Sequence, residues 1–198
     1  MGLDLKYIEG QTPLDEDEKE GLLIPTIATR EELDEFEQQN IEKAILWSLN
    51  RNLKPETIFK EDFIKRLHKE MYGDVWKWAG LFRKTNKNLG VDKWQISVAL
   101  KALLDDAKYW LANNAYNPDE LAIRFKHRIV AIHCFPNGNG RHSRLMADII
   151  ISKIFKQPVF TWGSGNLIKQ GDSRNEYLKA IREADKGNIA MLLKFAKN

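Results

Sequence analysis

Apolar residues recur every three or four positions along most of this chain, a spacing that predicts amphipathic helices. The pattern appears in seven segments: residues 29–51, 60–73, 96–114, 117–133, 140–155, 173–185 and 189–197. In the first segment, Thr29 followed by Glu32 forms a capping-box pattern. Pro118 lies in the first turn of the fourth, where its missing N–H costs little. The fold class is therefore expected to be mainly α, without internal repeats.

The segment 29–51 is expected to turn one apolar face toward the core. The residues that recur at helical spacing there are Leu33, Phe36, Ile41, Ala44, Ile45 and Leu49. Its polar residues are mostly acidic, so the opposite face is expected to be a solvated acidic surface.

One segment, "WAGLFRKTNKNLGVDKW" at residues 78–94, breaks the helical pattern. It contains Gly80, Asn86, Asn88 and Gly90, and it alternates too little for a buried strand. We expect a short exposed β-hairpin between two helices. Such a hairpin is either a plain surface loop or a flap beside a cleft.

Length and composition fit a soluble globular protein of one domain. The chain has 198 residues, of which 43% are hydrophobic and 30% charged. It has no apolar run of about 18 residues, and its first residues lack a basic stretch followed by an apolar core. Cys134 is the only cysteine, so an internal disulfide is excluded. These features predict a cytoplasmic protein with no membrane partner.

The net charge of +3 conceals an uneven distribution. Residues 1–40 carry a net charge of −9, and the remaining 158 residues carry +12. An acidic arm on a basic body is either a solvated leader or a segment that covers an anion-binding cleft. Residues 1–57 are therefore treated as an acidic N-terminal arm and helix with a regulatory role as one hypothesis, and residues 58–198 as the main domain.

The stretch "HCFPNGNGRHSR", residues 133–144, carries the candidate chemistry. Pro136 ends one helix, and the next begins near Asn139, so free backbone N–H groups and a positive helix end meet at one spot. Gly138 and Gly140 allow a ligand to approach the backbone closely. Arg141 and Arg144 share one face of the first turn, an arrangement that favours a bound polyphosphate.

His133 lies one turn from this anion site. A lone histidine at the end of an apolar helix is usually a core residue, but beside a phosphate it could take a proton from a hydroxyl. A P-loop is excluded because the stretch lacks its spacing and its lysine. A metal site built from His127, His133 and His142 is the weaker alternative, because the first two lie on different helix faces. No recognition helix or aromatic platform for specific nucleic acid is evident.

The stretch resembles the signature of Fic (Fido-domain) proteins, H-x-F-x-[D/E]-G-N-G-R-x-x-R, at every defined position except Asn137. The resemblance extends through the preceding hairpin segment and through "SRNEYLKAIREADKGN", and so covers about residues 58–198. The segments "TPLDEDEKEGLL", "PNGNGRHSR" and "FTWGSGNL" resemble the bacterial subgroup called mobile mystery protein B. The resemblance implies a Fic-type helical bundle.

Fic proteins mostly transfer AMP from ATP to a Ser, Thr or Tyr hydroxyl of a target protein. The resemblance implies that His133 is the general base and that Gly138, Asn139 and Gly140 surround the α- and β-phosphates. It further implies that Arg141 holds the β-phosphate and Arg144 the γ-phosphate. A target segment would dock along the flap through its main chain, near Arg83, Lys84, Thr85 and Asn86.

Asn137 stands where the family usually has an acid that binds Mg²⁺. An amide offers one neutral oxygen and lacks the charge that a hard cation prefers. Weaker metal dependence, another phosphate-containing donor and a feeble enzyme all remain open. The alternatives to adenylyl transfer are therefore Doc-like phosphotransfer and a non-catalytic nucleotide-binding module.

Many Fic proteins are inhibited by a helix whose glutamate pairs with the second arginine of the motif. The inhibitory pattern [S/T]-x-x-x-E-[G/N] is absent from residues 1–57, but Glu35 or Glu37 on the acidic helix could reach Arg144. Trp162 and the glycines around it either line the base pocket or merely turn the chain. Tyr177 either borders the same pocket or packs in the core, and core packing is favoured.

Overall fold

The protein is a bundle of α-helices, seen here in a computed structural model that describes residues 5, 7, 10–164, 167 and 171–198. The mainly α prediction is confirmed. The α-helices are α1 (Glu16–Lys19), α2 (Arg30–Leu49), α3 (Pro55–Ile58), α4 (Glu61–Tyr72), α5 (Ile96–Ala112), α6 (Pro118–Ile132), α7 (Asn139–Ile149), α8 (Asp172–Asp185) and α9 (Ala190–Lys197). Short turns of other helix types are η1 (Lys93–Gln95), η2 (Ile150–Ile154) and η3 (Trp162–Ser164).

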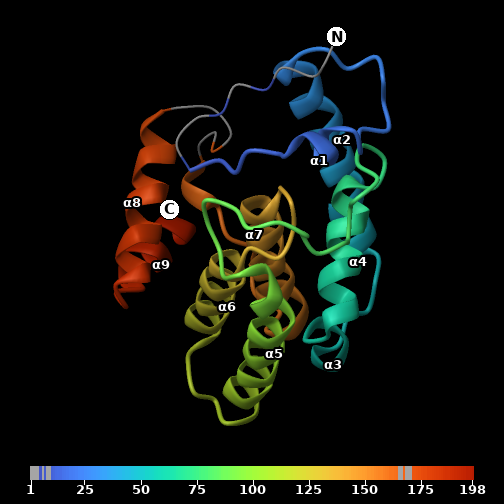
Figure 1. The fold of residues 1–198 in the computed structure, drawn as a ribbon. Coiled ribbons are helices and arrows are strands. Elements are labelled where there is room, and N and C mark those ends of the chain that lie inside the picture. The colour runs from blue at the N-terminus through green and yellow to red at the C-terminus, as the bar shows by residue number, and fades with distance from the viewer. Residues whose placement is uncertain (1–4, 6, 8–9, 165–166, 168–170) are drawn as a thin grey trace.

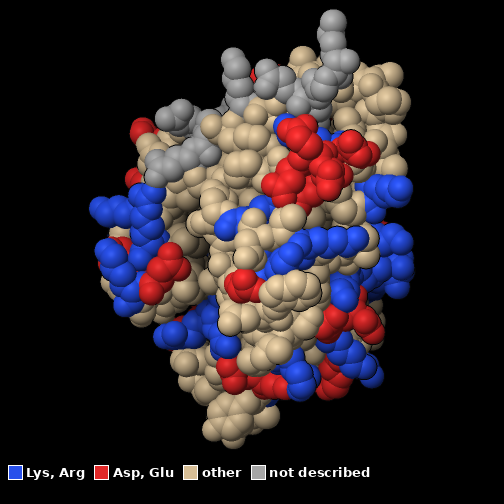
Figure 2. All heavy atoms as spheres, viewed as in Figure 1, with Lys and Arg blue, Asp and Glu red and all other residues tan. Residues whose placement is uncertain are grey.

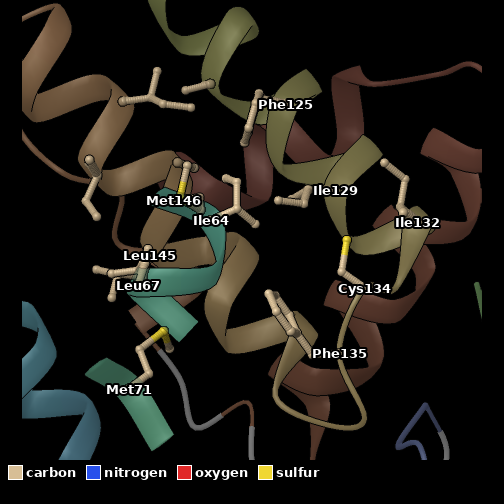
Figure 3. Packing of buried hydrophobic residues seen from close by; sticks show 14 of the residues in the cluster. Ile64, Leu67, Met71, Phe125, Ile129, Ile132, Cys134, Phe135, Leu145 and Met146 are labelled. Atoms are coloured by element: carbon tan, nitrogen blue, oxygen red, sulfur yellow. The ribbon is translucent and has the colours of Figure 1, made fainter. Parts of the chain in front are cut away.

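The helices pack in pairs around α6 and α7, which lie side by side at the centre (Figure 1). On one side α2 packs against α4, on the other α8 packs against α9, and α5 lies along α6. The core between them contains the apolar faces of α4, α6 and α7, and Phe135 points into it from the loop that joins the last two (Figure 3). Burial of this apolar surface is the main stabilising term of the fold.

Local sequence signals placed several helix ends correctly. Thr29 caps α2 by accepting from the Glu32 N–H at 3.2 Å, and Glu32 returns a bond to the Thr29 N–H at 3.0 Å. Pro118 is the first residue of α6. These helix ends depend only on interactions between residues close in the sequence, which is why the sequence alone predicts them.

The inward face of α2 differs from the predicted one. Leu33, Ile41 and Ala44 are buried as expected, but three other apolar residues of the predicted face are exposed: Phe36, Ile45 and Leu49. Polar residues take inward positions instead. Asn40 donates to the Glu70 carbonyl at 2.8 Å, and its Oδ1 accepts the Asp74 N–H at 2.9 Å. Side-chain partners on other elements therefore outweigh the apolar pattern here.

The flap, residues 82–91, returns to its starting point as a hairpin would, but it forms no β-ladder. The Arg83 N–H donates to the Cys134 carbonyl at 3.0 Å, and the Val91 N–H to the Ile132 carbonyl at 3.3 Å. The backbone N–H groups at both ends of the flap thus bond to the end of α6 rather than to each other. Within the described residues, the one isolated β-bridge joins Leu22 and Trp76.

The N-terminal arm, defined here by its described residues 10–15, crosses over the top of α7 and the flap before it reaches α1 (Figure 1). Acidic side chains gather around α1 on this face, and basic ones border them over the flap (Figure 2). Lys87 of the flap pairs with Asp15 at 2.9 Å and with Glu18 at 2.6 Å. Over the described part of the chain, no helix is both long and apolar enough to cross a membrane.

Candidate active site

The site is built on the glycine loop, residues 134–140, which follows α6 and includes the first two residues of α7. His133 ends α6 in the left-handed conformation, with φ 59° and ψ 61°. This conformation is uncommon for a residue with a side chain, so the surrounding structure must fix it. Gly90 of the flap approaches so closely that a Cβ there would lie 2.5 Å from the His133 Cβ.

Side chains hold the loop from within. The Asn139 side chain accepts the Phe135 N–H at 2.9 Å and donates to the Phe135 carbonyl at 2.8 Å. The Phe135 ring stacks on His68 with 3.7 Å between ring centroids and meets the edge of His142 at 5.2 Å. Asn139, predicted to surround phosphates, therefore contributes its side chain to the shape of the loop.

His68 is a neutral positioning group. Its Nδ1 accepts the Gly80 N–H at 3.0 Å, so its Nε2 carries the proton and donates to the Asn137 carbonyl at 3.1 Å. Burial lowers the pKa of His68 well below its usual value. His142 is also buried, with a pKa lowered to about 4, and bonds the Ile64 carbonyl at 3.1 Å.

Gly138 and Gly140 are glycines for different reasons. Gly138 has φ 76°, and a Cβ there would lie 2.5 Å from the Tyr72 ring, so the fold itself requires a glycine. A Cβ on Gly140 would meet no protein atom within 4 Å. The fold therefore does not require a glycine at residue 140, which lines the adjoining cavity.

His133 Nε2 lies 2.9 Å from the Thr12 hydroxyl of the N-terminal arm. Burial, followed by the charge of Arg83, lowers the pKa of His133 to about 4, against a hydrogen bond to the Val130 backbone that raises it. Because Nε2 faces Thr12, the nitrogen that donates to Val130 is Nδ1. At neutral pH the imidazole is thus a neutral base whose free lone pair accepts the hydroxyl proton.

The first turn of α7 carries the two arginines. Arg141 pairs with Glu37 of α2 at 2.6 Å, and its guanidinium lies 5.2 Å from the centroid of the Tyr72 ring. Glu37 is buried and also accepts the Trp76 indole N–H at 2.7 Å. The sequence hypothesis was that Glu35 or Glu37 could reach Arg144, whereas the structure pairs Glu37 with Arg141. Glu35, two positions away on the helix, lies on the exposed face and does not reach the site.

Arg144 faces the C-terminal helices. Its guanidinium lies 5.5 Å from the centroid of the Tyr177 ring, which the buried Lys126 approaches to 4.7 Å. Burial raises the pKa of the Tyr177 phenol, but the charges of Lys126 and Arg144 more than offset it and leave the pKa below its ordinary value. Tyr177 is buried, as expected, yet it also borders the site.

The Arg83 side chain is buried and bonds the backbone, rather than lying exposed on the flap as a docking residue would. Its guanidinium donates to the carbonyls of His133 at 2.6 Å, Thr85 at 2.8 Å and Val91. The other predicted flap residues, Lys84, Thr85 and Asn86, are exposed. The Thr85 hydroxyl bonds Asp15 of the N-terminal arm at 2.6 Å, so the outer surface of the flap is already in contact with a peptide segment.

Two adjoining cavities open at this site. The inner cavity, about 120 Å³, is lined by residues that include Thr12, His133, Gly138, Gly140, Arg141 and Arg144. The outer cavity, about 440 Å³, lies between the flap and α8, and Leu89, Val130 and Ile181 contribute apolar wall. The cavities share five lining residues: Gly10, His133, Gly140, Tyr177 and Leu178. The outer volume falls within the range of small-molecule sites.

The donor set does not fit a metal ion held by the protein. Across the described residues, no group of three or more His, Cys, Asp or Glu side chains could hold one. His127 bonds Asp185 and His142 bonds a backbone carbonyl, so the alternative three-histidine site is wrong. The Asn137 Oδ1 accepts the Gly138 N–H at 2.6 Å, and its amide donates to the Thr12 carbonyl at 3.0 Å. The loop supplies no carboxylate for Mg²⁺.

Residues 58–151, 94 of the 198 residues, match the sequence model of the Fic/DOC family. Among curated proteins, it is 28% identical to "Protein adenylyltransferase Fic" of Drosophila grimshawi over 136 residues, 67% of this chain and 26% of that protein. The Aedes aegypti protein of the same name is 26% identical over 145 residues, 69% of this chain and 28% of that protein. The chain thus spans about a quarter of the length of these relatives.

Solved structures share the fold. The Bartonella tribocorum BepC protein with bound AMPPNP matches with a TM-score of 0.68 and 17% identity, covering 91% of this chain and 95% of that one. Fic-1 from C. elegans matches with a TM-score of 0.65 and 22% identity, covering 90% of this chain and 50% of that one. The Fic-type helical fold is therefore confirmed.

Sequence reasoning missed Thr12, Glu37 as the partner of Arg141, and Tyr72 beneath Gly138. Thr12 lies 121 positions from His133, and no local pattern in the arm marks it. Tyr72 reads as an ordinary core residue at the end of α4. The glycine at residue 138 is the signal that the sequence offers, since it indicates a positive φ or a close neighbour, but it does not say which residue that neighbour is.

Proposed function

We propose that this protein is an adenylyltransferase that moves AMP from ATP to a Ser, Thr or Tyr hydroxyl of a target protein. The observation that carries the proposal is the hydroxyl held 2.9 Å from the neutral Nε2 of His133, beside the glycine loop and the start of α7. The names of the curated relatives and the AMPPNP bound by BepC support a nucleotide-dependent transferase.

In this proposal His133 is the general base. Its Nε2 takes the proton of the target hydroxyl, whose oxygen attacks the α-phosphorus of ATP while the bond to the β-phosphate breaks and pyrophosphate leaves. The hydrogen bond to Val130 fixes the tautomer that leaves Nε2 free. The low pKa keeps the base unprotonated at neutral pH before ATP binds.

The phosphates occupy the inner cavity and the nucleoside the outer one. Helix geometry leaves the first backbone N–H groups of α7 without partners inside the helix, and the helix dipole adds positive potential there. Arg141 and Arg144 add two guanidiniums, and Gly138 and Gly140 supply the close approach. These groups stabilise the charge that develops on the phosphates during transfer. Arg141 must exchange Glu37 for phosphate to take part.

Mg²⁺ would be bound mainly by the phosphates of ATP, and Asn137 would contribute little. When bound, the divalent cation would neutralise phosphate charge. Asn137 contributes instead through the bonds that shape the loop and hold the arm. We expect weaker metal dependence than an acid at residue 137 would give.

The remaining assignments belong to the same proposal. Residues 58–198 form the Fido domain, and residues 1–57 form a regulatory segment in which Glu37 restrains Arg141. The motif "PNGNGRHSR" supports membership of the bacterial mobile mystery protein B subgroup as part of this proposal, and the single cysteine favours the cytoplasm. Target segments dock on the exposed flap residues Lys84, Thr85 and Asn86, with no role for specific nucleic acid.

Two reactions compete with adenylyl transfer. In Doc-like phosphotransfer the nucleotide binds in the reverse orientation, and the Doc motif has a lysine at the position of Gly140. In this chain that position is a glycine with open space beside it. A non-catalytic nucleotide-binding module would need no base, whereas His133 is held as a neutral base beside a hydroxyl.

The test uses ATP labelled either at the α-phosphate or at the γ-phosphate, incubated with the full chain, Mg²⁺ and a cell lysate. We expect only the α label to appear on protein. A transferred γ label would establish phosphotransfer, and bound nucleotide with no transferred label would establish a binding module. His133→Ala should abolish transfer while ATP binding survives. His127→Ala is the matched control, because His127 lies on the same helix but bonds Asp185.

A further inference from the structure

The N-terminal arm occupies the target side of the candidate active site. Thr12 is 5% exposed, and its hydroxyl hydrogen bond is the one to the Nε2 of His133. A hydroxyl that served only packing would bond to a structural group. This one instead bonds the atom that the proposed mechanism uses as a base.

The arm is held by its main chain, as a docked peptide would be. The carbonyl of Gln11 accepts from Asn88 at 3.4 Å, that of Thr12 from Asn137 at 3.0 Å, and that of Pro13 from Lys87 at 3.3 Å. Three successive carbonyls are thus bonded by side chains of the flap and the glycine loop. Recognition through the backbone leaves the Thr12 side chain to the base.

Charged contacts fix the next turn of the arm. The Lys87 side chain is 3% exposed and pairs with the carboxylates of Asp15 and Glu18, and Thr85 donates to Asp15. Removing one partner of a buried pair costs more than removing one partner of a surface pair, because it leaves an unpaired buried charge. The arm is therefore anchored directly after the segment that presents Thr12.

We infer that Thr12 is a self-modification site, at which the chain transfers AMP from ATP to its own Oγ1. The inference rests on the proposed adenylyl transfer. The hydroxyl proton passes from Oγ1 to His133 Nε2, and Oγ1 forms a bond to the α-phosphorus of ATP. The bond between the α-phosphorus and the oxygen that bridges to the β-phosphate breaks, and pyrophosphate leaves. The product is AMP esterified to Thr12, and His133 returns its proton to solvent.

The proposed binding site for the phosphates of ATP lies in the same cavity as Thr12. Thr12 and His133 both line the inner cavity, together with Gly138, Gly140 and the two arginines of α7. A polyphosphate bound to these groups lies next to Oγ1. Because the acceptor is already tethered and oriented, transfer within one chain needs no encounter with a partner.

The experiment incubates the purified full chain with Mg²⁺ and ATP labelled at the α-phosphate, with no other protein present. We expect a mass increase of one AMP, located at Thr12 by peptide mass spectrometry. Thr12→Val should lose this label, Thr12→Ser should keep it, and His133→Ala should lose it. Thr26→Val is the matched control, because Thr26 is an exposed hydroxyl residue of the same N-terminal region, and it should label like the wild type.

Transfer within one chain is separated from transfer between chains by mixing. His133→Ala chains, which retain Thr12, are incubated with an equal amount of Thr12→Val chains, which retain the base. We expect no label on Thr12 of the His133→Ala chains, and a rate of wild-type labelling per chain that does not change on dilution. Label on those chains would overturn the intramolecular inference.

The outcomes also separate this inference from the proposed function. Wild-type label on a residue other than Thr12, or α label on lysate protein with none on the chain, overturns the self-modification site and leaves adenylyl transfer standing. Absence of α label on both the chain and the lysate overturns both. Site mapping on the wild type and the hydroxyl-retaining Thr12→Ser make the result independent of whether Thr12→Val folds.

Discussion

The ion pair between Glu37 and Arg141 predicts that one substitution will weaken the fold and strengthen nucleotide binding. Glu37→Gln keeps the oxygen that accepts the Trp76 indole N–H and removes the charge that holds Arg141. Losing one partner of a fully buried pair costs about 3–5 kcal/mol. The Arg141 side chain is 17% exposed and borders the inner cavity, where water can solvate it. A cost of about 2 kcal/mol is therefore expected, or about 4–8 °C in Tm for a chain of this size.

In the proposed function the same pair weakens ATP binding, because phosphate must displace Glu37 before it reaches Arg141. Removing a competitor worth about 2 kcal/mol should tighten ATP binding roughly 30-fold. Scanning calorimetry gives the Tm, and titration calorimetry with a non-hydrolysable ATP analogue gives the affinity. Glu35→Gln is the control, since that carboxylate lies on the exposed face of the same helix, and neither quantity should change. A lower Tm with an unchanged or weaker affinity would refute the reasoning.

Three further outcomes follow from the same site. Gly138→Ala should unfold or strongly destabilise the protein, because the added Cβ would collide with the Tyr72 ring. Gly140→Ala should keep a normal Tm and lose ATP affinity, because the added Cβ meets no protein atom. Equal losses of stability in the two variants would contradict this difference. Burial lowers the pKa of His133 and His142 to about 4 and that of His68 well below 6.5, so these histidines take up about three protons in the unfolded state, but not in the folded state, as pH falls below 6.5. Burial raises the pKa of Asp148 to about 7, so this carboxyl takes up one proton in the folded state and opposes the effect. Stability should thus be full above pH 7 and fall by about 3 kcal/mol per pH unit below pH 6, seen as a falling Tm, and a flat Tm between pH 6 and 4.5 would be inconsistent with this. Asn137→Asp should make ATP affinity more dependent on Mg²⁺, measured as the ratio of affinities with Mg²⁺ and with EDTA, and an unchanged ratio would argue against a metal role for this position.

The sequence predicted those parts of the fold that depend on neighbouring residues. Helix periodicity, the Thr29 cap and Pro118 at the start of α6 act within a turn or two, so they can be read directly from the chain. The order of histidine, glycine loop and helix start was predictable for the same reason. The structure places Gly138, Gly140 and both arginines around one cavity.

What could not be predicted depends on long-range partners. Glu37 and Asn40 are polar residues in the middle of a helix, and a pattern of hydrophobicity assigns them to solvent. They are buried because Arg141, Trp76 and the segment after α4 supply their hydrogen bonds. Arg83 was expected on the surface of the flap for the same reason, and the three carbonyls that it bonds were not visible from its neighbours.

The guanidinium of Arg83 joins the two ends of the flap to the carbonyl of His133 through one rigid plane of donors. A shift in the base of the flap would therefore displace the imidazole by a similar amount and disturb the reaction. Because these bonds go to backbone carbonyls, the exposed side chains of Lys84, Thr85 and Asn86 can be exchanged without breaking them. The tip of the flap can thus change its surface chemistry while its base stays tied to His133.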